Sequence, residues 1–224
     1  MISATKSRIS ARRGGEEEGD DFFSRFATDF PFDLALSIAV RMLKTAQKAL
    51  PTPYRLRVGT GLRTLDMQAR LYWRNYQLLE QEHPSWPASA LRRACNKYYA
   101  PPDAKAPPGH CTGGAVDVTL CGLDGAPLDM TSPLARWEAA YTYVENISDE
   151  AKANRNILIA AMFAAGFSNC RDEWWHWSYG DSAWAVRVGA PSACYGLIAP
   201  PHDYTHVPHP RRVRSPRLRA RRRK

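Results

Sequence analysis

Two short segments, far apart in the chain, carry side chains that bind metals and transfer protons. In residues 110–117, HCTGGAVD, a histidine and an aspartate lie seven positions apart with two glycines between them. In residues 173–176, EWWH, a glutamate and a histidine lie three positions apart beside tryptophans. A catalytic zinc site needs three protein ligands, an open position for water and a nearby base. Together the two segments contain these groups.

Each segment also has a simpler explanation. A single histidine beside a loop more often makes an ordinary hydrogen bond than a metal bond, and the polar residues of a tryptophan-rich strand can face solvent. However, a glutamate and a histidine among so much aromatic surface would destabilise the fold unless they were engaged. From the residues alone, both explanations stay open.

The backbone expected around the first segment would bring its two ends together. Two glycines, Gly113 and Gly114, permit a tight or left-handed conformation. Such a loop would turn His110 back toward Asp117. Residues 115–120, AVDVTL, predict a strand in which Asp117 points away from the face that buries the neighbouring valines.

The second segment poses a geometric problem. Residues i and i+3 of a flat strand face opposite sides, so Glu173 and His176 would not both face a metal. We therefore expect Glu173 to lie in the loop before the strand, or a bulge to redirect it.

The two segments resemble the zinc D-alanyl-D-alanine carboxypeptidase and dipeptidase family. Its pattern is Ser-x-His-x-x-Gly-x-Ala-x-Asp, followed later by Glu-x-x-His or Glu-x-Trp-His. The runs GGAVDVTL and EWWHWSYGD are most similar to the dipeptidase branch known from vancomycin resistance, and residues 61–63, GLR, resemble the family's Gly-Tyr-Arg element. The similarity spans roughly residues 54–198. The residues that match the pattern are His110, Gly113, Ala115, Asp117, Glu173, Trp175 and His176.

The resemblance implies a role for several side chains. The ligands of one zinc ion per chain would be His110, Asp117 and His176. Glu173 would act as general base, taking a proton from water and later giving it to the leaving amine. Arg63 would stabilise the substrate oxygen as it becomes negative. Taken alone, Arg63 would more simply form a salt bridge or a helix-cap contact with Asp66.

Substrate recognition is where the chain departs from the pattern. The Ser two positions before the first His is Pro108 here. The dipeptidases associate that Ser, and an Asp beyond the metal-binding strand, with the substrate amine. The Asp position falls near 134–135, which holds no carboxylate, with Glu138 close by as a replacement. Gln68 instead resembles the carboxypeptidase branch, and we expect Gln68 and Trp175 to contact the substrate.

The implied activity is hydrolysis of a D-alanyl-D-alanine bond in peptidoglycan metabolism. One form is a dipeptidase that acts on free D-Ala-D-Ala. The alternative is a D-Ala-D-Ala carboxypeptidase or a peptidoglycan endopeptidase acting on stem peptides, which Gln68 favours. A third possibility, from another class, is a non-catalytic protein that binds the cell wall or a nucleic acid. The intact set of ligands, base and arginine argues against it.

The net charge of +9 belongs to one end of the chain. Residues 211–224 hold nine Arg or Lys and no acid, which leaves residues 1–210 neutral. Such a run usually stays solvated, and its alternative role is contact with an anionic polymer. We expect a flexible leader in 1–30, a zinc peptidase domain in 31–205 and a disordered basic tail in 206–224.

Residue periodicity predicts an α+β fold, in which a small antiparallel sheet carries the zinc site and helices flank it. The expected strands are 54–58, 115–120 and 173–179, and the expected helices are 34–50, 64–79, 87–99 and 148–164. The prolines in 100–109 predict a loop that leads into His110.

The rest of the composition bears on cell compartment. The polar N-terminus lacks the apolar stretch of about 7–15 residues that a secretory signal needs, and no apolar run approaches the roughly 20 residues of a spanning helix. These features predict a cytoplasmic protein. The chain has 5 cysteines and no CxxC pair, which predicts free thiols rather than disulfides or a thiolate zinc site.

Overall fold

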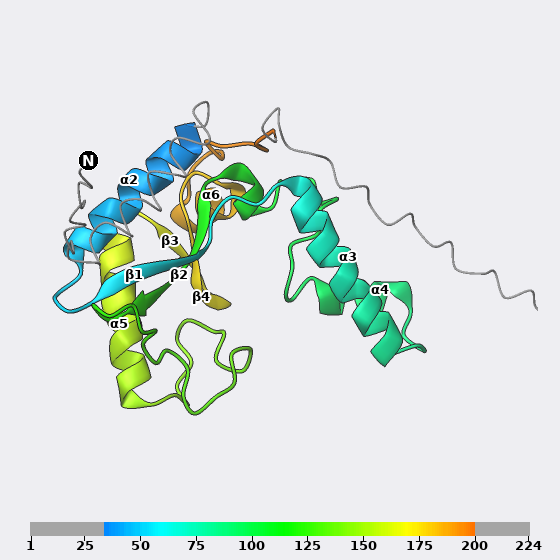
Figure 1. Cartoon of the computed structure of the whole chain (residues 1–224). Coiled ribbons are helices and arrows are strands. Elements are labelled where there is room, and N and C mark those ends of the chain that lie inside the picture. The colour runs from blue at the N-terminus through cyan, green and yellow to red at the C-terminus, as the bar shows by residue number, and fades with distance from the viewer. Residues whose placement is uncertain (1–33, 200–224) are drawn as a thin grey trace, which may run out of the picture.

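The computed structural model describes residues 34–199 (Figure 1). The leader predicted for 1–30 and the basic tail predicted for 206–224 lie outside the described residues, so the three-part division of the chain stays a prediction. None of the helices in the described range combines the length and the apolar character that a membrane crossing requires. All five cysteines lie within this range and are free thiols, as predicted.

A four-stranded antiparallel sheet organises the described residues. The strands lie in the order β1-β2-β4-β3. They are β1 (Arg55–Thr60), β2 (Ala115–Cys121), β3 (Ser168–Cys170) and β4 (Glu173–Ser178). The helices are α2 (Leu34–Ala49), α3 (Leu65–Glu82), α4 (Ala88–Cys95), α5 (Asp149–Ala164) and α6 (Ser182–Val188), with a short 3-10 helix η1 (Gly109–Thr112) before β2. The predicted α+β fold is confirmed.

The main core lies on one face of this sheet. In Figure 1, α2 and α5 lie together on one side of the sheet, whereas α3 and α4 extend beyond the other side. Val118 and Leu120 of β2 are buried with Leu43 of α2 and Leu158 of α5. Because side chains alternate along a strand, the intervening residues of β2 face away from this core.

Capping side chains set where three helices begin. Thr64 Oγ1 accepts a hydrogen bond from the backbone of Met67, and Ser148 Oγ accepts one from Ala151. Both helices begin within one residue of the positions predicted from the sequence, 64 and 148. Asp181 caps α6 in the same way, through the backbone N–H of Trp184.

Three elements were not expected from the sequence. They are η1 with 4 residues, β3 with 3 and α6 with 7. Elements this short do not complete enough turns or alternations to show a period.

A buried arginine holds the long segment between β2 and α5. Arg155 is 2% exposed. Its guanidinium donates to the backbone carbonyls of Met130 (2.8 Å), Ala139 (2.6 Å), Tyr141 (2.7 Å) and Thr142 (3.3 Å). Burial lowers the pKa of Arg155 to about 10. A single side chain thus provides a donor for four backbone carbonyls of this irregular segment.

Candidate metal centre

Two of the candidate ligands lie on the paired central strands. Asp117 of β2 is directly opposite His176 of β4 in the antiparallel ladder. Val116 and Val118 are buried in the core, so Asp117 points to the opposite face, as predicted. Side chains opposite one another in such a pair lie on the same face of the sheet. The pairing therefore brings Asp117 and His176 together.

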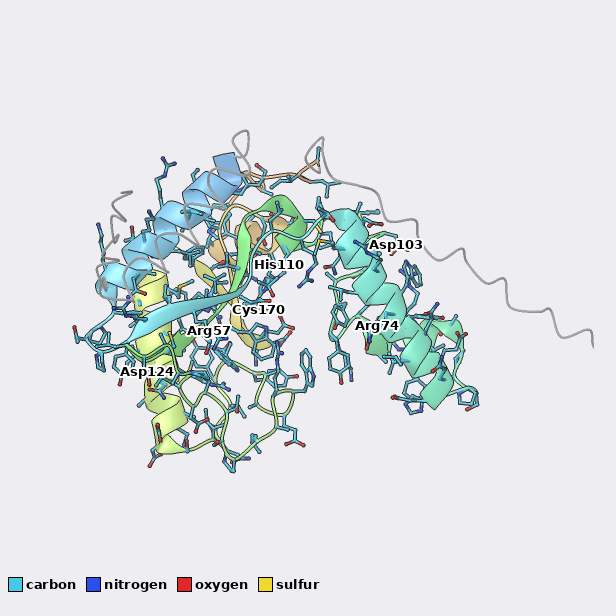
Figure 2. All side chains as sticks on the ribbon, in the orientation of Figure 1. Arg57, Arg74, Asp103, His110, Asp124 and Cys170 are labelled. Carbon is cyan, nitrogen blue, oxygen red and sulfur yellow. The ribbon has the colours of Figure 1, made fainter. Side chains whose placement is uncertain are left out.

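The third candidate ligand comes from the turn before β2. His110 lies in η1, which ends at Gly113 with the positive φ of 68° that favours glycine. A Cβ at Gly114 would lie 2.4 Å from the carbonyl oxygen of Tyr179, which follows β4. The chain therefore passes tightly against β4 and turns His110 toward the sheet. In Figure 2, His110 lies between the sheet and α3.

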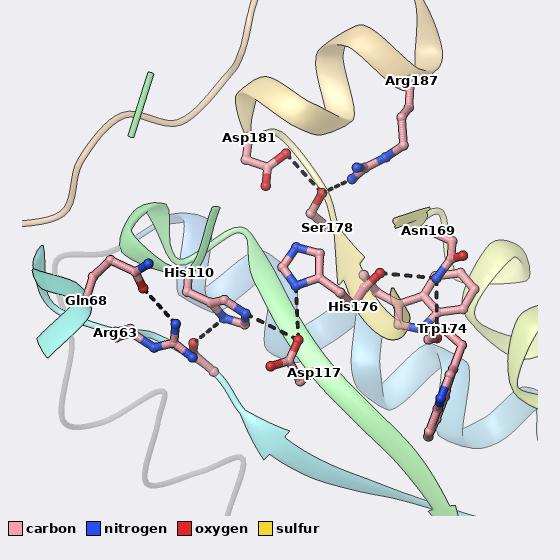
Figure 3. Close-up of polar contacts among 12 residues, drawn as sticks. Arg63, Gln68, His110, Asp117, Asn169, Trp174, His176, Ser178, Asp181 and Arg187 are labelled. Atoms are coloured by element: carbon pink, nitrogen blue, oxygen red, sulfur yellow. Dashed lines mark hydrogen bonds and ion pairs between the residues drawn. The ribbon is translucent and has the colours of Figure 1, made fainter. Parts of the chain in front are cut away.

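The three side chains converge on a small volume. Asp117 Oδ1 is 3.3 Å from His110 Nε2 and 3.0 Å from His176 Nδ1. The two imidazole rings meet edge to face, with centroids 4.8 Å apart. One ligand atom from each of the three residues lies within 4.8 Å of the others. Figure 3 shows the three side chains pointing toward one another.

A further hydrogen bond orients the imidazole ring of His110. Its Nδ1 lies 2.9 Å from the carbonyl oxygen of Gly61. A carbonyl only accepts, so Nδ1 carries the proton and Nε2 keeps its lone pair on the side of Asp117. Metal-bound histidines are typically oriented by such a bond from the other ring nitrogen.

The pKa values of the cluster reflect burial and mutual contact. Burial alone would raise the pKa of Asp117, but its contacts with His110 and His176 hold it well below its ordinary value. Burial lowers the pKa of His110. Burial would also lower the pKa of His176, but its hydrogen bond to Asp117 outweighs this and raises it. The pKa values of the two histidines are thus shifted in opposite directions, down for His110 and up for His176.

Glu173 reaches this neighbourhood through an irregularity in β4. On β3, Asn169 and Cys170 are consecutive, yet their partners on β4 are Trp177 and Glu173. The extra residues form the bulge that the spacing of Glu173 and His176 requires, which confirms the predicted irregularity. Asn169 fastens it, because its amide donates to the carbonyl of His176 at 3.1 Å. Burial raises the pKa of the Glu173 carboxyl, and His176 is the charge that most strongly lowers it.

Arg63 adjoins the same cluster. Its backbone N–H donates to the carbonyl of His110 at 3.0 Å, and its guanidinium donates to Gln68 Oε1 at 2.7 Å. The sequence suggested Asp66 as a partner for Arg63. Asp66 Oδ2 instead lies 3.2 Å from Arg70 Nη2. Gln68 is 1% exposed, and its amide donates to the carbonyl of Ala100 at 2.7 Å. Both ends of the Gln68 side chain are thus engaged within the protein.

Two charged residues near the site were not singled out from the sequence. Asp181 is 1% exposed and accepts from Ser178, which also receives a bond from Arg187 (Figure 3). The Oδ2 atom of Asp181 makes no hydrogen bond within residues 34–199, and the charge of Asp181 raises the pKa of His176. Arg136 stacks on Trp175. In the sequence, Asp181 stands out only as the last residue of the run EWWHWSYGD, and Arg136 only by following positions 134–135.

The residues considered for amine recognition are placed differently. Pro108 is the residue before η1 and makes no side-chain cap. Glu138 is exposed, and its carboxylate accepts a hydrogen bond from the backbone of Ala135 at 3.2 Å. Glu138 therefore stabilises its own turn.

Comparisons with known proteins place the chain in a family. A family profile described as D-ala-D-ala dipeptidase matches residues 81–193, about half of the chain. That range contains the three candidate ligands and Glu173, and it begins after Arg63 and Gln68.

Two curated relatives also match. A D-alanyl-D-alanine dipeptidase of Synechocystis sp. is 37% identical over 91 residues, covering 35% of this chain and 37% of the relative. A D-alanyl-D-alanine dipeptidase of Escherichia coli is 30% identical over 113 residues, covering 50% of this chain and 58% of the relative. The matches thus span less than two thirds of either relative. The family match, together with the pattern that it contains, shows that the chain belongs to the D-Ala-D-Ala dipeptidase family of peptidases.

Proposed function

We propose that the chain is a zinc peptidase that hydrolyses the D-alanyl-D-alanine bond, acting as a D-Ala-D-Ala dipeptidase in peptidoglycan metabolism. The observation that carries this proposal is the convergence of His110, Asp117 and His176, with ligand atoms within 4.8 Å. Membership of the dipeptidase family and the names of both relatives support it.

The donor set fits zinc. Two imidazole nitrogens and one carboxylate oxygen are ligands that zinc takes in catalytic sites, where a fourth position stays open. When bound, the ion would supply Lewis acidity, which polarises a carbonyl and lowers the pKa of the attacking water far below its bulk value, to about 7.

Glu173 is the general base of this proposal. It takes a proton from water as the water oxygen attacks the carbonyl carbon, and it gives that proton to the nitrogen as the C–N bond breaks. The second proton of the water also passes to the amine, so the products are a carboxylate and an ammonium group. Burial raises the pKa of Glu173, which makes its protonated form able to survive until the second transfer.

Arg63 and Gln68 act as a pair in this proposal. The guanidinium of Arg63 stabilises the carbonyl oxygen as it becomes negative, which requires that the guanidinium be held in place. Gln68 holds it, because its Oε1 accepts from Arg63 and its amide is fixed on Ala100. We therefore assign Gln68 a positioning role in place of a direct substrate contact. Trp175 stays a predicted substrate contact; it is 6% exposed.

Purified protein tests the proposal through its metal content and through D-alanine release from D-Ala-D-Ala. We expect about one zinc per chain, turnover that is lost on chelation and restored by zinc, and no turnover of L-Ala-L-Ala. His176→Ala provides the matched metal-free control. A zinc-loaded protein that released D-alanine from neither the dipeptide nor a muropeptide would refute the proposal.

The alternative is a D-Ala-D-Ala carboxypeptidase or a peptidoglycan endopeptidase. The engagement of Glu138 within its own turn favours it, because one oxygen of this carboxylate already accepts from the backbone of Ala135. Kinetics on D-Ala-D-Ala and on a muropeptide ending in D-Ala-D-Ala separate the two activities. Higher kcat/KM for the longer substrate would establish the alternative.

A further inference from the structure

An arginine lies on two indole rings at the edge of the candidate metal centre. The guanidinium carbon of Arg136 is 4.8 Å from the ring centroid of Trp175 and 5.2 Å from that of Trp137. Trp175 directly precedes His176, and its ring meets Trp137 edge to face with centroids 5.7 Å apart. Tyr98, which follows α4, packs edge-on against the other indole, Trp137, at 4.8 Å. Two indoles from separate segments thus contact this guanidinium, and Tyr98 packs against one of them.

Arg136 also lies near the proposed base. Among the groups that act on the pKa of Glu173, Arg136 has a larger effect than Arg63. Yet within residues 34–199 no carboxylate lies in ion-pair distance of Arg136, so it does not neutralise Glu173. Among the described residues, this cation therefore has no partner of opposite charge.

Other arginines of the domain already use their guanidinium N–H groups in hydrogen bonds. The acceptor is the amide oxygen of Gln68 for Arg63, backbone carbonyls for Arg155 and a serine hydroxyl for Arg187. Arg136 is exposed and stacked. A guanidinium that lies on an aromatic face keeps its in-plane N–H groups free, and these match a carboxylate in a two-pronged hydrogen bond.

We propose that Arg136 binds a carboxylate of the substrate and is a specificity-determining residue of the peptidase activity proposed above, on which this inference rests. The charge balance agrees. With a divalent ion bound, Arg63 and Arg136 outweigh Asp117 and Glu173, so the site as a whole favours an anionic substrate over a cationic one. The carboxylate has two possible sources. It is either the C-terminal carboxylate of the leaving residue or a carboxylate on the acyl side of the scissile bond.

Three small ligands distinguish these sources by binding, without turnover. N-acetyl-D-alaninamide is the neutral reference, N-acetyl-D-alanine carries the C-terminal carboxylate, and N-succinyl-D-alaninamide carries an acyl-side carboxylate. Isothermal titration calorimetry of the zinc-loaded protein gives a Kd for each. We expect one of the acids to bind about tenfold or more tightly than the reference, the contribution typical of a hydrogen bond to a charged group.

Substitutions of Arg136 test whether this residue causes the tighter binding of the acid. Arg136→Met and Arg136→Gln should reduce it below about twofold, and Arg136→Lys should retain part of it because the charge remains. Arg93→Met, an exposed arginine of α4, is the matched control and should bind like the wild type.

The outcomes separate this inference from the proposed function. Wild-type protein without preference for either acid, or an undiminished preference in both neutral variants, would overturn the role of Arg136, because the carboxylate would then bind elsewhere or not at all. Failure of the peptidase proposal would instead appear as absent D-alanine release, whatever the Kd values are.

Discussion

Asp117 and His176 face each other across the two central strands, with Asp117 Oδ1 3.0 Å from His176 Nδ1. The paired backbones of β2 and β4 hold these two candidate ligands. His110 depends on a short turn and on its bond to Gly61. A metal at this point would therefore join a rigid sheet to a loop.

Substitutions at Glu173 and His176 should separate chemistry from metal binding. Glu173→Ala is expected to keep zinc and lose about 10²–10⁴-fold in kcat, because the proton acceptor is gone. His176→Ala is expected to lose both zinc and activity. Elemental analysis and D-alanine release measure the two effects. Substantial turnover in Glu173→Ala would show that another group accepts the proton.

Zinc affinity should rise with pH across the neutral range. His176 has a raised pKa in the metal-free protein and must lose its proton before Nδ1 can bind a metal. Below that raised pKa, zinc competes with the proton and releases it; above it, the competition ends and the affinity levels off. Calorimetry in buffers of different ionisation enthalpy counts the released proton.

A distant histidine controls for this effect. His83 ends α3 and stacks on Trp86, so His83→Gln should release the same number of protons as the wild type. A zinc affinity that did not vary with pH would contradict the assignment to His176.

Gln68 offers a test of positioning against substrate contact. Gln68→Leu removes the acceptor for Arg63, so we expect kcat to fall on the order of tenfold while zinc content and KM change little. A direct substrate contact would instead raise KM and leave kcat unchanged. Steady-state kinetics on zinc-loaded protein decides between the two.

Arg155 should be one of the most sensitive positions for stability. Arg155→Met leaves four backbone carbonyls without their donor, and we expect a loss of at least about 3 kcal/mol in the free energy of unfolding. Urea denaturation measures this loss, with Arg93→Met as the surface control. A loss below about 1 kcal/mol would mean that water replaces the guanidinium.

Gly114 should tolerate no side chain. The Cβ of Gly114→Ala would lie 2.4 Å from the Tyr179 carbonyl, so the strands must separate there, at a cost of about 1–3 kcal/mol. Gly196→Ala, where nothing lies within 4 Å, is the matched control. Equal stability of the two variants in thermal denaturation would contradict the close approach.

Strong periodicity and side-chain caps made most of the fold predictable. α2, α3 and α5 repeat their apolar residues over several turns, and Thr64 and Ser148 mark two of the helix starts. The short elements η1, β3 and α6 show no period. The path between β2 and α5 depends on Arg155, and a buried cation bound to backbone carbonyls has no spacing that a sequence can reveal.

The candidate site was predictable where residue type and spacing suffice. The spacing of Glu173 and His176 required an irregular strand, and the bulge supplies it. The positions of Arg136 and Asp181 depend on tertiary packing, because Arg136 rests on indoles from two segments and Asp181 is buried and bonded to Ser178 at the end of β4. Such neighbours are visible only once the chain is folded.

The pairing of β2 with β4 has a consequence for folding. A slip of one residue between these strands would turn Asp117 into the apolar core and expose a valine in its place. That mispaired sheet would bury a carboxylate and lose the facing ligands at once, so zinc would not bind it. Zinc would bind only the correctly paired sheet and stabilise it by an amount that grows with the free metal concentration. The ion that we propose for catalysis would therefore also favour the correct alignment of β2 and β4 as the protein folds.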